Sequence, residues 1–142
     1  MKQMKMSDEV KNCIRGAVYI PFATAGTYKL DWGTPPYGCH MVQTRSDFIM
    51  FPDDETIAWP AAGMSGTQSN LRENGKIQII AILVKDGKLV NGYRIEGDGE
   101  FHKDGPIFDQ FKQKYDWANG CVVMKVARIG QSRELTKVLL KY

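Results

Sequence analysis

The chain has 142 residues, a length that suits one domain with its own hydrophobic core, and we expect residues 1–142 to form a single domain. The formal net charge is +3 and no run of lysines or arginines forms a basic stripe, which disfavours a nucleic-acid partner. No stretch approaches the roughly 18–20 apolar residues of a membrane-spanning helix, and the polar N-terminus lacks the apolar core of a signal peptide. These features predict a cytoplasmic protein with no membrane partner.

In chain order, the first expected element is an N-terminal helix within residues 1–15. Ser7 is suited to cap its first amides, and Asp8 and Glu9 suit the positive end of a helix. Gly16 is a residue type that commonly ends a helix.

The remainder of the chain predicts mostly strands, with two further short helices and a C-terminal extension at 130–142. The expected helices are 67–74 and 105–118, and the expected strands are 17–25, 37–44, 47–51, 56–60, 76–84, 89–102 and 121–129. Strands and helices do not alternate, so a doubly wound parallel sheet is disfavoured. A closed antiparallel barrel is favoured because closure removes exposed strand edges. Gly92, Gly97 and Gly99, inside the long strand, predict bends or bulges where the sheet curls.

Residues 59–70, W-P-A-A-G-M-S-G-T-Q-S-N, combine the end of a strand, small residues and the start of a helix. Backbone amides at a helix N-terminus attract phosphate. The hydroxyls of Ser65 and Thr67 add donors, and Gly66 permits close approach of a ligand. A planar ring would fit against the flat, small residues Pro60, Ala61, Ala62 and Gly63. The alternative is an ordinary turn in which Thr67 caps the helix.

A second polar group stands at the end of the strand predicted for 37–44. Gln43 offers an amide to the edge of a ring, and Thr44 and Arg45 offer donors to a phosphate; the alternative is a solvated strand end. Trp117 either stacks on a ligand ring or seals the core.

Catalytic and metal-binding constellations are not readable in the sequence. No Ser–His–Asp, paired-carboxylate or metal-ligand pattern is present, and we assign no catalytic residue. The cysteines, Cys13, Cys39 and Cys121, are odd in number and widely spaced, which disfavours a disulfide framework or a zinc site.

Three stretches of the chain together resemble the pyridoxamine-phosphate-oxidase-like split-barrel flavoproteins, and among them the small stand-alone bacterial FMN-binding proteins. They are Q-T-R with the hairpin that leads into P-A-A-G-M-S-G-T-Q-S-N-L, then E-G-D-G-E-F-H-K-D-G-P-I-F-D, then D-W-A-N-G-C-V-V-M-K-V. The likeness runs from about Gly16 to Ile129.

The resemblance implies a mainly β fold, a six-stranded antiparallel split barrel of the FMN-binding type, that forms a homodimer with one FMN per subunit. It places the FMN phosphate at Thr44, Ser65, Gly66 and Thr67, and the isoalloxazine ring along Pro60, Ala61, Ala62 and Gly63. It places Gln43 near the ring or the ribityl chain, and Trp117 near the ring.

The chain departs from the resemblance at two positions. Relatives commonly carry a lysine where this chain has Gly66, and small relatives carry a tryptophan where it has Arg45. Our hypothesis is that Arg45 supplies the phosphate charge that the lysine would have supplied.

Two flavin functions stay open, and a third reading is a cofactor-free β-barrel binding module. The first is an FMN-dependent oxidoreductase, and the second is an FMN-carrying electron-transfer or storage protein without a dedicated organic substrate. A dimer would cover the many large apolar residues, and its C-terminal arm is a candidate second wall for the ring. The large residues are Trp32, Trp59, Trp117, Phe101, Phe108 and Phe111, and those of the arm are Val138, Leu139, Leu140 and Tyr142.

Overall fold

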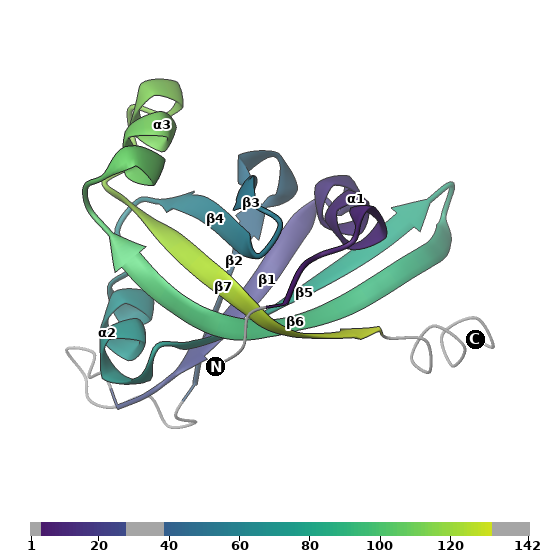
Figure 1. The fold of residues 1–142 in the computed structure, drawn as a ribbon, viewed down its shortest axis with the longest axis horizontal. Coiled ribbons are helices and arrows are strands. Elements are labelled where there is room, and N and C mark those ends of the chain that lie inside the picture. The colour runs from purple at the N-terminus through teal and green to yellow at the C-terminus, as the bar shows by residue number, and fades with distance from the viewer. Residues whose placement is uncertain (1–3, 28–38, 132–142) are drawn as a thin grey trace.

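The computed structural model describes residues 4–27 and 39–131, and these form one antiparallel sheet with three α-helices (Figure 1). The strand order in the sheet is β2-β1-β5-β6-β7-β4-β3. The strands are β1 (Tyr19–Ala25), β2 (Cys39–Arg45), β3 (Met50–Asp53), β4 (Thr56–Ala61), β5 (Lys76–Lys85), β6 (Lys88–His102) and β7 (Gly120–Gln131). The helices are α1 (Asp8–Gly16), α2 (Ser65–Asn74) and α3 (Pro106–Lys114), with one 3-10 turn, η1 (Ser46–Phe48).

The mainly β antiparallel class expected from the sequence is confirmed. The described residues form seven strands, as many as the ranges expected from the sequence, whereas the resemblance implied a six-stranded barrel; the four-residue β3 is the edge strand beside β4. The expected strand over 47–51 is displaced, since Ser46–Phe48 form a 3-10 turn and the strand begins at Met50. The hairpin that leads into β4 is present, and Asp53 pairs with Thr56 across its tight turn.

The main core lies between α1 and the inner face of the curled sheet. Ser7 caps α1 as expected, since its side chain accepts a hydrogen bond from the Val10 amide at 3.3 Å. The apolar stripe of α1 then buries Val10, Cys13 and Ile14. Trp59 and Phe111 are also buried inside the subunit, so they do not need a partner chain to cover them.

A bulge at Gly97 curls the long strand β6. The register between β6 and β7 shifts between Glu96 and Gly97, which confirms the bend expected from the glycines. A Cβ atom at Gly97 would lie 2.0 Å from the carbonyl oxygen of Lys125. Only glycine therefore fits where the two backbones approach each other.

Helix α3 ends at Lys114, four residues before the expected end at 118. The Lys112 side chain explains the shape of the turn that follows. Its Nζ atom donates to the carbonyl oxygens of Asp116 at 2.6 Å and Ala118 at 2.8 Å. These bonds hold Trp117 at a tight turn rather than on a helix.

Most of the segment 27–37 and all but the start of the extension at 130–142 lie outside the described residues.

Candidate functional site

A cavity of about 300 Å³ lies where the end of β2, the end of β4 and the turn after α3 meet. It brings together side chains from chain segments that are far apart in the sequence. Its lining residues are Tyr19, Gln43, Thr44, Arg45, Phe48, Pro60, Ala62, Met64 and Trp117. The sequence had singled out Gln43, Thr44, Arg45, Pro60, Ala62 and Trp117 as site residues.

The register between β1 and β2 sets the orientation of the β2 side chains. Tyr19 pairs with Arg45 and Pro21 pairs with Gln43, so Gln43 and Arg45 share the outer face of the sheet with Tyr19. Thr44 points to the opposite face and is buried, with 6% of its surface exposed. The strand end is thus not a uniformly solvated segment, since Thr44 is buried even though it lines the cavity together with its neighbours.

The small-residue segment after β4 contributes alternate residues to the cavity wall. Pro60 and Ala62 line the cavity, whereas Ala61 is fully buried and pairs with Gly120 of β7. The segment is fixed by Asn119, whose backbone amide donates to the Ala61 carbonyl at 3.0 Å and whose Oδ1 accepts from the Gly63 amide at 2.9 Å. Ala61 and Gly63 therefore shape the wall through their backbone.

Part of the cavity wall is aromatic. Phe48 and Trp117 line the cavity with ring centroids 5.4 Å apart, and Tyr115 contacts both rings at 4.9 and 5.3 Å. Trp117 is 44% exposed, so it does not seal the core. A ring that entered the cavity would contact both small residues and aromatic residues.

Arg45 borders this aromatic cluster and is already paired. Its Nε and Nη2 atoms donate to the two carboxylate oxygens of Asp47 at 3.0 and 2.9 Å. The guanidinium also lies over the Phe48 ring, 5.4 Å from its centroid. Both side chains of the ion pair are more than half exposed. The Arg45 charge is therefore compensated locally.

Helix α2 begins beside the cavity after two residues in the left-handed region. Gly63 has a φ of 86° and Met64 a φ of 57°, and together they turn the chain from β4 into the helix. Met64 is the N-cap residue, so the alternative in which Thr67 caps the helix is wrong. The first helical hydrogen bond runs from the Gln68 amide to the Met64 carbonyl at 2.9 Å.

The first turn of α2 leaves donors without partners. Within residues 4–27 and 39–131, the amides of Ser65, Gly66 and Thr67 have no acceptor. The Oγ1 atom of Thr67 is buried and has no hydrogen-bond partner there either. A buried unpaired hydroxyl is costly, and an anion at this helix end would satisfy it together with the free amides. Met64 connects this turn to the cavity, which the three residues themselves do not line.

The unpaired donors and the cavity wall have the chemical character needed to bind the two ends of FMN. A phosphate matches the unpaired donors of the helix end, and an aromatic heterocycle matches a cavity walled by Pro60, Ala62 and Trp117. Tyr19, Phe48 and Met64 also line the cavity and were missed from the sequence. For Phe48, the one helpful sequence feature was its position three residues after the Q-T-R group, which we had assigned to the site.

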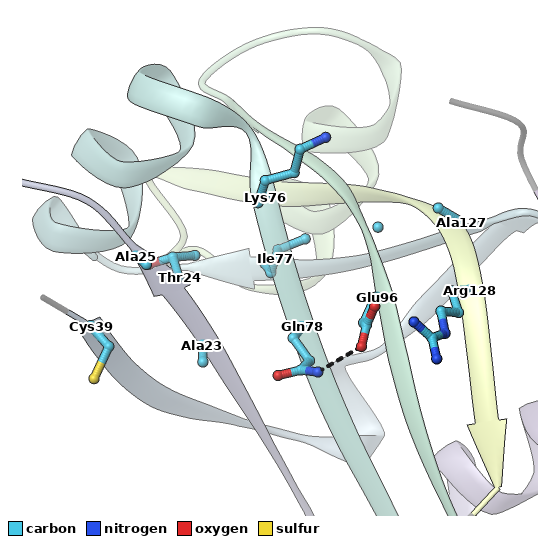
Figure 2. Close-up of a pocket in the computed structure, with 11 residues that line it drawn as sticks. Ala23, Thr24, Ala25, Cys39, Lys76, Ile77, Gln78, Glu96, Ala127 and Arg128 are labelled. Atoms are coloured by element: carbon cyan, nitrogen blue, oxygen red, sulfur yellow. Dashed lines mark hydrogen bonds between the residues drawn. The ribbon is translucent and has the colours of Figure 1, made fainter.

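A larger cavity, of about 560 Å³, lies on the outer face of the sheet (Figure 2). A row of paired residues, Ala23, Gln78, Glu96 and Arg128, crosses four strands at its floor. The Gln78 amide nitrogen donates to a Glu96 carboxylate oxygen at 3.1 Å, as the dashed line in Figure 2 marks. This cavity is lined by none of the residues that the sequence singled out for FMN binding.

Burial makes two of the three cysteines unreactive. Cys13 and Cys121 are buried free thiols and Cys39 is an exposed one. Burial raises the pKa of the Cys121 thiol to about 11, so it stays protonated at neutral pH. Among the described residues no group of three or more potential metal ligands gathers. None of the described helices has the length and apolar character needed to cross a bilayer.

Fold and cavity define a mainly β split barrel with a cavity beside a helix N-terminus. Residues 6–140 match the family model described as pyridoxamine 5'-phosphate oxidase, and the chain belongs to that family. A protein of Nitratidesulfovibrio vulgaris named "FMN-binding protein" is 25% identical over 99 residues, which cover 67% of this chain and 80% of that protein.

Solved structures show the same fold. HupZ of Group A Streptococcus superposes with a TM-score of 0.69 at 21% identity, covering 89% of this chain and 94% of HupZ. An FMN-binding protein of Syntrophomonas wolfei superposes with a TM-score of 0.62 at 18% identity, covering 86% of this chain and 82% of that one.

Proposed function

We propose that this chain binds FMN and works as a cytoplasmic flavin oxidoreductase. The observation that carries the proposal is the meeting of Gln43, Pro60, Ala62 and Trp117 around one cavity, beside a helix end with unpaired donors. The name of the Nitratidesulfovibrio vulgaris relative supports the choice of FMN.

In this proposal the two ends of FMN are held by different elements. The ring lies between the small wall, Pro60 to Gly63, and the exposed face of Trp117, which excludes water from it. The Gln43 amide donates to or accepts from the polar edge of the ring or the ribityl chain. FMN itself supplies the redox chemistry, by accepting and releasing a hydride or electrons.

The phosphate end belongs to α2. The amides of Ser65, Gly66 and Thr67 point out of the first turn, and the Thr67 hydroxyl adds a donor that nothing else satisfies. Thr44, buried at the end of β2 and lining the same cavity, offers a further hydroxyl. This arrangement lets neutral donors orient the phosphate while the cavity selects the ring.

We propose further that two copies associate through the outer face of the sheet. Five large apolar residues are exposed there: Met41 by 69% of its surface, and the other four by 39% to 56%. They are Tyr19, Met41, Ile80, Ile82 and Val84. The strand register places Tyr19, Met41 and Ile80 on one face. Exposed apolar surface on this scale is typical of a protein interface, and Tyr19 connects it to the cavity.

The sequence pointed to a dimer because many large apolar residues need to be covered, and these exposed residues take the place of some of those named there. Trp59 and Phe111 are covered inside the subunit, and Trp32 lies outside the described residues. The C-terminal arm, which we expected to provide a second wall for the ring, also lies outside the described residues. The arm therefore stays a prediction.

The test is the visible spectrum of the purified protein, with and without added FMN, followed by titration with FMN and with riboflavin. We expect a bound flavin spectrum and tighter binding of FMN than of riboflavin. A protein that changes the spectrum and fluorescence of neither flavin would refute the proposal. Reduction of the bound flavin by NADH or NADPH in single-turnover mixing would support the oxidoreductase; reduction only by an electron-transfer protein would support the carrier function instead.

A further inference from the structure

A groove of about 500 Å³ runs along α2 on the side of β6. Gln68 and Arg72 contribute from the helix, and Glu100, His102 and Lys103 contribute from the end of β6 and the residue after it. Ser65, Gln68 and Arg72 are spaced three and four residues apart, so they share one face of the helix. The groove therefore follows the helix face that leads to its N-terminus.

The Arg72 side chain is directed toward that end. Its Nε atom donates to the carbonyl oxygen of Gln68, one turn earlier, at 3.4 Å. Side chains in a helix lean toward the N-terminus in general, and this contact shows that the guanidinium does so here. The first turn itself, Ser65 to Gln68, contains no charged residue.

Arg72 and Lys103 are cations without carboxylate partners in the described part of the chain. The carboxylate of Glu100, which also lines the groove, contacts His102 at 2.8 Å. Both cations line one groove, so they add positive potential along its length.

Two further carboxylates lie beside the groove, and each already has an ion-pair or hydrogen-bond partner. Asp98 pairs with Lys76 at 2.5 Å, and Glu73 accepts from the Thr27 amide at 2.8 Å. None of the three acids forms an ion pair with Arg72 among the residues that the structure describes. Arg45, in contrast, is held by Asp47 on the aromatic side of the cavity.

We propose that Arg72, with Lys103 across the groove, supplies the positive charge for a phosphate held at the N-terminus of α2, and that Arg45 acts at the ring instead. The proposal rests on the proposed FMN-binding function. Arg72 meets the phosphate from the side of the helix, while the amides and the Thr67 hydroxyl meet it along the axis. Arg45 belongs to the aromatic wall and contributes equally to ligands with and without a phosphate.

The experiment measures the affinities of FMN and riboflavin for the wild type, Arg72→Ala and Arg45→Ala by flavin fluorescence titration. We expect Arg72→Ala to weaken FMN about tenfold and riboflavin less than about twofold, because only FMN has the charged group. Arg45→Ala should weaken both ligands by the same factor. Lys103→Ala should also weaken FMN binding more than riboflavin binding, but by a smaller factor than Arg72→Ala does.

Arg72→Lys and Lys85→Ala are the matched controls. Arg72→Lys keeps the charge and should retain most of the FMN affinity. Lys85→Ala removes one positive charge from the far end of β5 and should change neither affinity. The assignment is overturned if Arg72→Ala leaves FMN binding unchanged or weakens both ligands alike, or if Arg45→Ala weakens FMN alone. A wild type that binds neither flavin overturns the proposed function as well, so the two failures are distinguishable.

Discussion

Filling the 300 Å³ cavity from Ala62 should abolish flavin binding without unfolding the protein. Ala62 is exposed, lines the cavity and follows the last residue of β4, so a larger side chain there displaces no core residue. A benzene-sized group occupies an apolar cavity of about 150 Å³. The phenyl group of Ala62→Phe would therefore take up about half of the cavity of about 300 Å³.

We expect Ala62→Phe to weaken FMN and riboflavin together by at least tenfold, or about 1.4 kcal/mol, because the ring is excluded whether or not the phosphate is present. Fluorescence titration measures the affinities, and thermal unfolding shows that the variant is folded. Ala62→Ser adds only a hydroxyl and serves as the control with near wild-type binding. A folded Ala62→Phe variant that binds FMN as the wild type does would show that the ring lies elsewhere.

Three further predictions test the phosphate site, the interface and the thiols. Thr67→Ala removes the buried hydroxyl and should lower FMN affinity about fivefold, whereas Thr67→Ser should not; equal affinity of all three proteins would move the phosphate away from α2. Ile82→Glu places a charge on the exposed apolar face, and light scattering should then give the mass of a monomer; an unchanged dimer mass would locate the interface elsewhere. At neutral pH a thiol reagent should label Cys39 but not Cys121 of the native protein, and labelling of both would contradict the burial. Since burial raises the pKa of the Cys121 thiol from 9.0 to about 11, its contribution to stability is full below pH 9 and is lost as the pH rises toward 11. Over this pH range, denaturant unfolding should show a smaller loss of stability for Cys121→Ala than for the wild type.

Local patterns predicted the elements of the fold well where burial follows a simple period. The buried stripe of α1 follows directly from apolar spacing, but the alternating burial of β5 does not, because residues 79–84 are apolar throughout while Ile80, Ile82 and Val84 are exposed. The bulge at Gly97 was also predictable, because glycine inside a strand marks close backbone approach. The boundaries were harder: the end of α3 depends on Lys112 bonding two carbonyls of the following turn, which no local pattern encodes.

The candidate site was predictable in outline and not in detail. Small residues and hydroxyls around 60–67 indicated a ligand site, but which of them face the cavity depends on the pairing of Ala61 with Gly120 across the sheet. Arg45 has a carboxylate two residues along the chain, and only the 3-10 turn brings Asp47 within reach of its guanidinium. Asn119, which fixes the turn before α2, lies 56 residues from its partner Gly63 and carries no local signal.

A crystal structure of the purified protein with FMN tests the central claim most directly. We predict density for the isoalloxazine ring between Ala62 and Trp117, with the phosphate on the amides of Ser65 to Thr67. Density for FMN in the larger cavity lined by Gln78 and Arg128, or a phosphate remote from α2, would contradict the account.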